Sequence, residues 1–424
     1  FFVRSSITGH GQQGEFIPRN HFINVNGGAN EFSWLVWKEC GDNPIYPQGG
    51  TWVYDRAGWC PGSATDIRYS DITSYVTAGQ TATVDYDVQV ASGDSRYIVN
   101  NQLVTYGAIN QTLDAAIIEI QEPSNKIEYS RFNSICNKPK VVIKNTGSTL
   151  LTSAIIEFWV NDSPSPETFN WSGSLEFGES EVVELPTPVT LWSPITVSDN
   201  KFHAKITSPN GGADGYSYND HFISPFEITE VMPSTIIIFF KTNNAPNETS
   251  YQVTDDIGTV LLSRSGLSGN TLYRDTLELG LGCYNYHVSD SGDDGISWWA
   301  NNDGNGYTYL FSPGLGQVKQ FTGDFGDNID FNFTVDFPLS YDEINGKFDI
   351  ELYPNPAKSL FTVEAENLAT AIITIYDNTG KEVQLAREVQ NDSINFNTSS
   401  LDSGIYIIQI NRNGRIDTEK LVIE

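Results

Sequence analysis

The sequence predicts an all-β protein made of several β-sandwiches in tandem, and three observations support this fold class. The 424 residues include 36 glycines and 19 prolines, which supply many turns, but a single methionine. Aromatic residues make up 12% of the chain, and the longest apolar runs, such as residues 234–240, have the length of one strand. This balance favours short strands separated by tight turns over long helices.

The charge balance narrows the range of partners. The chain carries 24 basic and 53 acidic side chains, a formal net charge of −29. Such a charge repels phosphate backbones and anionic headgroups, so we expect no nucleic-acid partner and no membrane-surface binding. No stretch approaches the roughly 18 apolar residues of a membrane-spanning helix, so we expect no transmembrane segment. A strongly acidic chain is instead typical of a highly soluble protein or of one that binds calcium ions.

Length and composition divide the chain into four expected domains: 1–118, 119–226, 227–342 and 343–424. The chain opens in a strand pattern at residues 1–8, without a methionine or a secretory leader, so we expect a further segment to precede it. Apolar residues alternate over 81–90, which predicts a strand. The stretch 112–130 is typical of a final strand of the first domain followed by a linker.

The second expected domain contains a turn sequence between two apolar runs. Lys140–Lys144 and Ala154–Val160 flank Asn145-Thr-Gly147, which predicts a β-hairpin. Together with the later segment Gly173-Ser-Leu-Glu-Phe-Gly178, this pattern resembles CARDB-type immunoglobulin-like modules. For residues 227–342 we expect a further β-sandwich.

The last domain carries four motifs in a fixed order. They are Leu352-Tyr-Pro-Asn-Pro-Ala-Lys358, Gly380-Lys-Glu-Val383, Gly404-Ile-Tyr406 and Lys420-Leu-Val-Ile-Glu424. The two prolines Pro354 and Pro356 fix an extended entry segment, and Asn378-Thr-Gly380 predicts a tight turn. On a strand, Tyr406, Ile408 and Ile410 would share one face, so the residues predict a small antiparallel sandwich.

These motifs together resemble the type A C-terminal sorting domain of the type IX secretion system of Bacteroidota. The resemblance implies a small immunoglobulin-like fold and export across the outer membrane to the extracellular space or the cell surface. It also implies recognition of residues 343–424 by the secretion translocon, an outer-membrane shuttle barrel and a sortase. The residues that carry the sorting motif are Tyr353, Pro354, Asn355, Pro356, Gly404, Tyr406 and Lys420.

Candidate functional residues gather near the start of the chain. His10 stands between two glycines and precedes Glu15 by five residues, and Asp55-Arg-Ala-Gly-Trp-Cys-Pro-Gly62 places an Asp–Arg dipeptide beside an aromatic ring. From the residues alone, Asp55 and Arg56 can equally form a structural ion pair, and His21 can be a satisfied sheet residue. The sequence has no metal-ligand spacing of the H-x-H or C-x-x-C kind and no nucleophile motif here.

This combination resembles the second half of the peptide-N-glycosidase F family, amidases built from two jelly rolls with the active site at their interface. The match runs through Gly9-His10, Glu15, Arg19, His21, Cys40, Asn43-Pro44 and Asp55–Gly62. It implies a jelly roll in which Glu15 is an active-site residue and Arg56 lines the sugar site. Glycan binding would involve His10, Asp55 and Trp59. A Cys40–Cys60 disulfide is also implied, closing a loop of about 20 residues and contributing roughly 3 kcal/mol.

The sequence departs from that family in ways that bear on catalysis. Gln13 and Ile17 stand where the family has cysteines beside the glutamate, and Thr8 stands where it has a tryptophan. The family's principal catalytic aspartate lies on the first jelly roll, which this sequence lacks. Amide hydrolysis needs a base to activate water and donors to stabilise the oxyanion. We therefore expect the 424-residue chain alone to be inactive.

Two functions compete at this point. One is a type IX cargo carrying half of an amidase that cleaves the glycan–asparagine linkage when complete. The other is a non-catalytic surface adhesin or glycan-binding protein exported by the same system. Neither requires a cofactor for its chemistry. Tryptophan side chains can stack on sugars in either case, although several must be core; they are Trp34, Trp37, Trp52 and Trp59.

Two acidic loops, 290–295 and 301–306, flank Ile296-Ser-Trp-Trp-Ala300. Hard cations take oxygen ligands on a tightly turning backbone, and the first loop resembles an element that recurs in secreted Bacteroidota modules. The expected calcium ligands are Asp290, Asp293, Asp294 and Asp303. The alternative is a pair of Asx-rich turns around a buried Trp pair. Cys136 and Cys283 leave the cysteine count even, and a bond between them would staple two domains.

Overall fold

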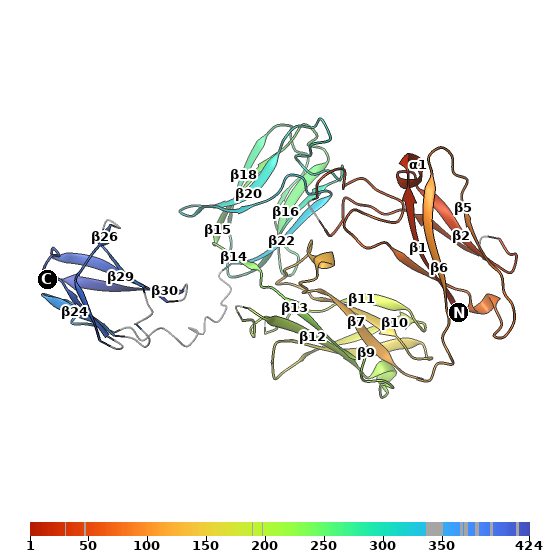
Figure 1. Ribbon diagram of the computed structural model, residues 1–424, viewed down its shortest axis with the longest axis horizontal. Helices are drawn as coiled ribbons and strands as arrows, with labels where there is room; N and C mark the ends of the chain where they lie inside the picture. The colour runs from red at the N-terminus through yellow and green to blue at the C-terminus, as the bar shows by residue number, and fades with distance from the viewer. Residues whose placement is uncertain are drawn as a thin grey trace. The chain divides into compact units, whose positions relative to one another are not determined.

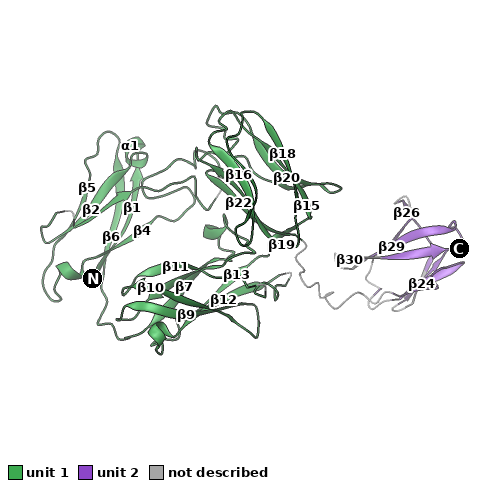
Figure 2. Cartoon of the chain, turned by 180° about the vertical axis from the view of Figure 1, so that it is seen from behind, with its two compact units in different colours: residues 1–339 green, residues 340–424 purple. Residues whose placement is uncertain are grey.

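The computed structural model describes residues 1–335 and 351–424, apart from residues 30, 46–47, 189, 197, 365–367, 369–371, 378–380, 391–392 and 413–414. Two compact units make up the chain, Phe1–Leu339 and Ser340–Glu424 (Figure 2). Strands dominate both units, and the first contains three β-sandwiches in sequence (Figure 1). The all-β tandem architecture predicted from composition is therefore present.

The first sandwich is formed by the start of the chain. Its elements are β1 (Phe2–His10), α1 (Gln12–Glu15), β2 (Arg19–Val25), β3 (Phe32–Val36), β4 (Ile67–Asp71), η1 (Thr73–Tyr75), β5 (Val84–Val88) and β6 (Arg96–Val104). Two three-stranded sheets, β4–β1–β6 and β3–β2–β5, pack face to face. The side chains of β1 alternate between buried and half-buried, so Val3 packs against Ile23 and Val25 of β2. The predicted strand over 81–90 is β5, which is shorter at both ends.

The second sandwich has the largest cluster of buried apolar residues among the described residues of the first unit. Its elements are β7 (Ala115–Glu122), η2 (Ile127–Tyr129), β8 (Lys140–Asn145), β9 (Leu151–Val160), β10 (Glu167–Leu175), β11 (Ser180–Glu184), β12 (Asn200–Thr207), η3 (Pro209–Gly211) and β13 (His221–Phe226). The sheet β10–β9–β12–β13 packs on the sheet β11–β8–β7. Phe158 and Phe202 from one sheet meet Val141 and Ile143 from the other in this core.

Two expectations for this region are wrong. β8 and β9 do not form a hairpin, because β8 pairs with β7 and β11 whereas β9 pairs with β10 and β12 in the opposite sheet. The connection crosses between the sheets because the N–H groups of Thr146 and Gly147 both donate to the Asp114 carbonyl at 3.0 Å. β7 does not end the first sandwich, since it pairs with β8, and the expected boundary at residue 118 falls within this strand.

The third sandwich follows without a long linker. Its strands are β14 (Glu230–Met232), β15 (Thr235–Lys241), β16 (Thr249–Asp255), β17 (Val260–Arg264), β18 (Leu272–Glu278), β19 (Gly282–Asp290), β20 (Tyr307–Ser312), β21 (Gly316–Gln320) and β22 (Asn328–Val335). The sheet β14–β22–β19–β16–β17 packs on the sheet β18–β15–β20–β21. The apolar run predicted as a strand is β15, whose Ile236, Ile238 and Phe240 lie in the core.

The second unit is a small sandwich of two four-stranded sheets, β23–β24–β28–β27 and β26–β25–β29–β30. Its strands are β23 (Glu351–Tyr353), β24 (Leu360–Glu364), β25 (Ile372–Tyr376), β26 (Glu382–Val383), β27 (Arg387–Gln390), β28 (Ser393–Asn397), β29 (Gly404–Arg412) and β30 (Arg415–Ile423). Tyr406, Ile408 and Ile410 share the buried face of β29, as the pattern predicted. The predicted turn Asn378-Thr-Gly380 lies outside the described residues.

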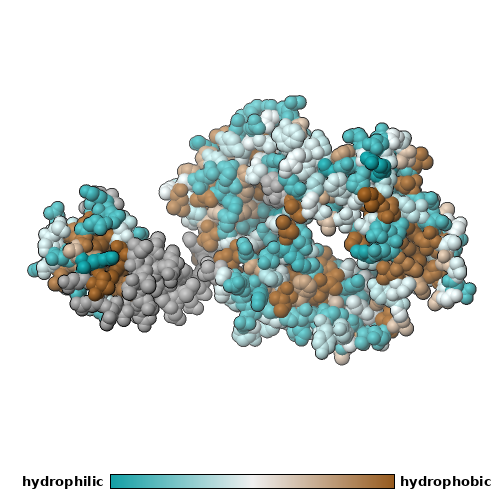
Figure 3. Space-filling view, in the orientation of Figure 1, coloured by the Kyte–Doolittle hydropathy of each residue, from teal (hydrophilic) through white to brown (hydrophobic). Residues whose placement is uncertain are grey.

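Direct links join the three sandwiches of the first unit. Cys136 and Cys283 form a disulfide between the second and the third sandwich. The Arg131 side chain is fully buried and donates hydrogen bonds to the carbonyls of Asn43 (3.0 Å) in the first sandwich and Phe325 (2.7 Å) in the third. Hydrophilic side chains spread widely over the face of this unit shown in Figure 3, in keeping with the net charge of −29. No helix among the described residues is long and apolar enough to cross a membrane.

Candidate functional site

The predicted catalytic pair, Glu15 and Arg56, forms an ion pair in the first sandwich, in which Arg56 is buried and Glu15 is partly exposed. Glu15 ends the single turn α1 that follows β1, and its Oε1 accepts a hydrogen bond from Arg56 Nε at 2.8 Å. Main-chain bonds fix both residues, because Ala57 N donates to the Glu15 carbonyl and Gly9 N donates to the Ala57 carbonyl, each at 2.9 Å. The structure thus brings together two residues that are 41 positions apart.

The Arg56 guanidinium has all of its hydrogen-bonding capacity engaged within the protein. Besides the bond to Glu15, Nη1 donates to the carbonyls of Trp52 (3.4 Å) and Tyr54 (2.6 Å). Nη2 donates to the carbonyl (2.9 Å) and the hydroxyl (3.5 Å) of Thr51. All three guanidinium nitrogens therefore donate to protein oxygens here. Arg56 therefore shapes the loop 51–56, and it cannot bind a sugar without breaking these contacts.

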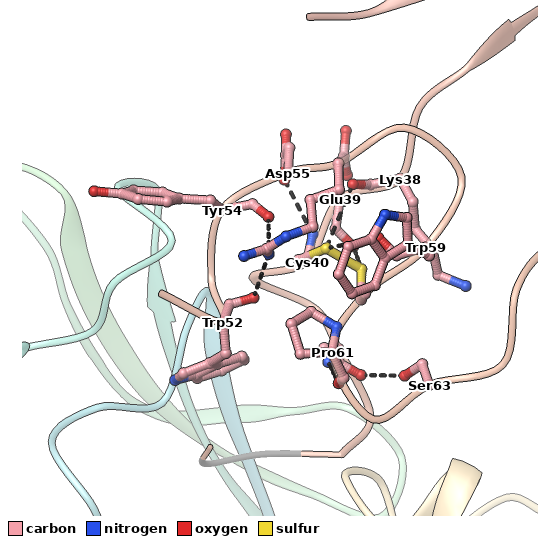
Figure 4. Close-up of a disulfide and its surroundings, with 12 residues drawn as sticks. Lys38, Glu39, Cys40, Trp52, Tyr54, Asp55, Trp59, Pro61 and Ser63 are labelled. Atoms are coloured by element: carbon pink, nitrogen blue, oxygen red, sulfur yellow. Dashed lines mark hydrogen bonds between the residues drawn. A yellow bond between two sulfur atoms is a disulfide. The ribbon is translucent and has the colours of Figure 1, made fainter. Parts of the chain in front are cut away.

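A cleft of about 630 Å³ lies beside this loop, between the first and the third sandwich. Its lining residues are Gln12, Phe16, Trp37, Thr51, Val53, Tyr54, Asp55, Gly292, Asp293, Asp294 and Trp298. The ring of Tyr54 meets the edge of Trp298 with centroids 5.3 Å apart, and Trp52 Nε1 donates to Asp324 Oδ1 at 3.0 Å. In Figure 4 the side chains of Trp52 and Tyr54 both point away from the nearby disulfide. The cleft thus combines aromatic rings with carboxylate acceptors from two sandwiches.

The three predicted glycan-binding residues do not lie together. Asp55 lines the cleft, where its Oδ1 accepts from Cys40 N (3.0 Å) and its Oδ2 from Trp37 Nε1 (3.3 Å). Asp55 therefore does not pair with the adjacent Arg56, whose carboxylate partner is Glu15. His10 and Trp59 are outside the cleft lining and contact each other, with ring centroids 5.8 Å apart.

A second histidine in the motif has a structural role. His21 is completely buried, its Nδ1 contacts the hydroxyl of Tyr86, and burial lowers its pKa to about 4. His21 is thus a buried residue of the sheet strand β2, but its Nε2 is buried without a hydrogen-bond partner, so the side chain is not fully satisfied.

The loop that carries Asp55 is closed by the Cys40–Cys60 disulfide (Figure 4). Both sulfurs are buried, and the sequence separation is 20 residues. A loop of this size gives about 3 kcal/mol by chain entropy. A hydrogen bond next to the disulfide joins the same two ends of the loop, because Asn43 Nδ2 donates to the Pro61 carbonyl at 2.8 Å. The disulfide and this hydrogen bond thus anchor the two ends of the segment that carries Asp55.

The predicted calcium ligands divide into two groups. Asp290 and Asp294 place carboxylate oxygens within 4.8 Å of one another and of Glu248, a residue that no sequence motif indicated. Asp290 is 2% exposed, and burial raises its pKa to about 7. Asn301 Nδ2 donates to Asp294 at 2.9 Å, and the charge of Asp303 acts on both Asp294 and Glu248. Calcium at this cluster stays a prediction.

Asp293 and Asp294 both line the cleft, but Asp293 is not part of the group formed by Glu248, Asp290 and Asp294. Its Cβ lies 2.6 Å from where a Cβ on Gly41 would stand, so only glycine fits at position 41 of the first sandwich. Burial and the charge of Asp55 raise the Asp293 pKa. The expected buried Trp pair is also split, because Trp298 is 6% exposed in the cleft wall whereas Trp299 is 68% exposed. No sequence motif marks Trp298 as a binding residue, because its aromatic neighbours in the cleft, Trp37 and Tyr54, belong to the first sandwich.

The sorting-motif residues meet at one edge of the second unit. Asn355 Nδ2 donates to the Lys420 carbonyl at 2.6 Å, and Val422 N donates to Asn355 Oδ1 at 2.9 Å. Asn355 thereby pins the segment with Pro354 and Pro356, next to Tyr353 of β23, onto the last strand, β30. Gly404 begins β29, and the hydroxyl of Tyr406 donates to the Asp402 carbonyl at 3.0 Å. The first and the last of the sequence motifs are therefore in direct contact in the structure.

Residues 351–424 match the secretion system C-terminal sorting domain. The chain is thus directed by a type IX secretion signal to the cell surface or the extracellular space. Residues 3–109 match the family described as Peptide-N-glycosidase F, C terminal. These two matches agree with the two resemblances drawn from the motifs.

A relative of known activity supports the match of the first sandwich to the peptide-N-glycosidase F family. The chain is 31% identical over 120 residues to Peptide-N(4)-(N-acetyl-beta-D-glucosaminyl)asparagine amidase F of Elizabethkingia miricola. This alignment covers 24% of the chain and 33% of the relative, so the chain spans about a third of that amidase.

Solved structures show only slight likeness to the whole chain. Drosophila OTK extracellular domains 3-5 are 8% identical with a TM-score of 0.16, covering 74% of this chain and 99% of that one. The Bacteroides ovatus protein SGBP-B, solved with a mixed-linkage heptasaccharide, is 10% identical with a TM-score of 0.17 and coverages of 74% and 71%.

Proposed function

We propose that this exported protein binds neutral carbohydrate in the cleft between its first and third sandwiches. The observation that carries the proposal is the cleft lining, in which the rings of Trp37, Tyr54 and Trp298 stand beside the carboxylates of Asp55 and Asp293. Sugar rings stack their C–H faces on aromatic side chains and donate hydroxyl hydrogen bonds to carboxylates. The acidic lining and the net charge of −29 disfavour sialylated or sulfated glycans.

The similarity to the amidase suggests the kind of carbohydrate. That relative's name specifies the N-acetylglucosaminyl–asparagine linkage, so we propose an asparagine-linked glycan as the ligand. Titration calorimetry with a neutral N-glycopeptide tests this, with the same peptide lacking its glycan as the reference. We expect Tyr54→Ala to weaken binding on the order of tenfold, the effect of about 1.4 kcal/mol of lost stacking.

A control on the same sandwich makes the experiment specific. Tyr69 is 56% exposed and Tyr54 44% exposed, but Tyr69 lines a different cavity, of about 500 Å³. Tyr69→Ala should therefore bind the glycopeptide as the unchanged chain does. Equal losses in the two variants, or no binding by the unchanged chain, would reject the cleft as the site.

A second candidate function is hydrolysis of the glycan–asparagine amide. The sequence match to the amidase favours it, but the engaged Arg56 and the ion-paired Glu15 leave no free oxyanion donor or unpaired base in this pair. The family resemblance places a catalytic aspartate on another jelly roll, so we expect no turnover by residues 1–424 alone. Release of free glycan from an N-glycopeptide, abolished by Glu15→Gln, would establish the amidase instead.

We propose that the second unit is the signal that directs the chain to the type IX secretion system. The match of residues 351–424 to the sorting-domain family supports the proposal that the type IX translocon, an outer-membrane shuttle barrel and a sortase recognise residues 343–424. A reporter fused to these residues should be exported by a host with a type IX system. Retention of the fusion inside the cell would contradict this role.

A further inference from the structure

The wall of the carbohydrate cleft carries carboxylates that no positive side chain in the same wall matches. Asp55 belongs to the first sandwich, and Asp293 and Asp294 belong to the third. None of the other described lining residues is a lysine, an arginine or a histidine. A cleft lined by charge of one sign raises the local concentration of ligands of the opposite sign. The charge of this wall therefore selects among ligands.

The three carboxylates differ in how far the protein already uses them. Asp55 accepts hydrogen bonds from two N–H groups, and Asp294 accepts one from Asn301 Nδ2 at 2.9 Å. Asp293 is half-buried, and among the described residues its carboxylate has no hydrogen-bond or ion-pair partner. Asp293 is thus the carboxylate of the cleft that is available to a ligand.

The surroundings of Asp293 supply no compensating charge. The charged groups that act on its carboxyl are all acidic: Asp55, Glu39, Asp294 and Asp42. Arg56 lies against the cleft wall, with its guanidinium carbon 5.2 Å from the ring centroid of Phe16, but it is paired with Glu15. A carboxylate in such a partly desolvated place forms a strong charge-assisted bond with a cationic donor.

Aromatic rings complete a site that suits a cation. Tyr54 meets Phe16 edge to face with centroids 6.2 Å apart, and it meets Trp298 in the same way at 5.3 Å. The interplanar angles are 88° and 89°, so neighbouring rings stand at right angles to each other. The face of an aromatic ring attracts a cation held within about 6 Å of its centroid. The alkyl stem of a lysine or arginine can pack along such rings while its charged end reaches a carboxylate.

The main chain determines where the Asp293 carboxylate lies. Its φ is 59°, in the left-handed region that aspartate and asparagine tolerate better than most residues with a Cβ. The first sandwich packs closely against it, since a Cβ on Gly41 would stand 2.6 Å from Asp293 Cβ. Asparagine can therefore take the place of this aspartate without a change of backbone conformation.

We propose that the cleft prefers glycopeptides with a lysine or arginine beside the glycosylated asparagine, and that Asp293 binds the charged end of that side chain. This inference rests on the proposed function, which supplies the glycan part of the ligand. The relative's name specifies an N-acetylated sugar, whose nitrogen is an uncharged amide, so the positive charge has to come from the peptide. The cleft volume of about 630 Å³ is in the range of sites that bury a drug-sized ligand, so a sugar ring and a side chain can share it.

Titration calorimetry on the full chain, with a chelator in the buffer, compares two glycopeptides that differ in one residue. One has lysine beside the glycosylated asparagine, and the other has norleucine, which keeps the alkyl stem and lacks the charge. We expect the lysine glycopeptide to bind about tenfold more tightly. High salt should reduce this ratio, because it screens the charges. The chelator keeps divalent cations from competing at Asp294, which also belongs to the group with Glu248.

Asp293→Asn tests the residue itself. The affinity ratio between the lysine and norleucine glycopeptides should fall to about twofold in this variant, because asparagine keeps the shape and removes the charge. Comparing ratios separates this effect from any contact of Asp293 with the glycan. The matched control is Asp199→Asn, since Asp199 also has a left-handed φ, of 61°, but is exposed in the second sandwich. This control should retain the full ratio.

The outcomes distinguish this inference from the proposed function. Equal binding of the two glycopeptides by the unchanged chain would overturn the inference and leave the carbohydrate cleft in place. Binding of neither glycopeptide would reject the proposed function and the inference with it. A lysine preference that persists undiminished in Asp293→Asn would also overturn the inference. If this variant does not fold, the ratio and its salt dependence in the unchanged chain decide the question.

Discussion

Replacing Arg131 with methionine should separate the first and third sandwiches without altering any single core. The side chain of Arg131 is fully buried, and its N–H groups reach the Asn43 carbonyl in one sandwich and Phe325, Asp327 and Asn328 in the other. Methionine fills a similar volume but leaves these acceptors without donors and Asp327 without its ion-pair partner. Breaking a buried pair costs about 3–5 kcal/mol, and the 30% exposure of the Asp327 side chain favours the lower end.

Differential scanning calorimetry measures this loss. An unfolding entropy of about 2.1 cal/mol/K per residue amounts to about 0.7 kcal/mol/K for residues 1–339, so a loss of about 3 kcal/mol should lower their transition by about 4 °C. The matched control is Arg4→Met, because Arg4 bonds an exposed Gln102 within the first sandwich. Surface changes of that kind stay within about 0.5 kcal/mol. Melting of the Arg131 variant at the same temperature as the Arg4 variant would refute the reasoning.

The pH dependence gives an independent check on the same variant. Burial raises the Asp327 pKa to about 6 even though Arg131 lowers it. A carboxyl whose folded pKa lies above its unfolded value stabilises the fold while protonated, and this stabilisation is lost as the pH rises through the folded pKa. Without Arg131 the folded pKa rises further. The gap in stability between the variant and the unchanged chain should therefore widen from pH 5 to pH 8.

Three further predictions concern the other links and sites. Replacing Cys136 and Cys283 together by serine should destabilise the first unit by about 5 kcal/mol, from a closed loop of 147 residues, in denaturant titrations; a loss no greater than the roughly 3 kcal/mol of the 20-residue loop would contradict this estimate. Without divalent cations, the third sandwich should lose stability as the pH rises through about 7, because the folded pKa of buried Asp290 is raised; saturating calcium should reverse this trend, and an identical pH profile in both conditions would remove the ion from that cluster. Deleting residues 351–424 should abolish export while leaving the melting of the first unit unchanged, which secretion assays and calorimetry together can check.

The sequence was informative where function and structure are encoded locally. The sorting motif was recognisable because its residues contact each other, as Asn355 of the first motif bonds Val422 of the last motif. The Cys40–Cys60 bond was implied by a family resemblance, and both cysteines lie within the short segment that carries this resemblance. The all-β class followed from composition, which sums over the whole chain. The sorting motif and the disulfide thus depend on short segments of sequence, and the fold class depends on the average composition of the chain.

Features made by contacts between sandwiches were not predictable. Glu248 joins Asp290 and Asp294 only because β16 and β19 are neighbouring strands of one sheet. Trp298 reaches Tyr54 across 244 residues because two sandwiches meet there, and no local pattern marks such a contact. The predicted hairpin after Asn145 failed for a related reason, since a turn sequence does not reveal whether the chain stays in one sheet or crosses to the other.

The order of the cysteines along the chain has a consequence for oxidative folding. Four cysteines allow three complete pairings, of which one is native. Cys60 follows Cys40 by 20 residues, whereas Cys283 follows Cys136 by 147. A chain that is exposed to oxidant from its N-terminus can therefore close the short loop first. Once that bond exists, Cys283 is the one remaining partner for Cys136 among the four cysteines of residues 1–424, so the order of these cysteines along the chain favours the native pairing.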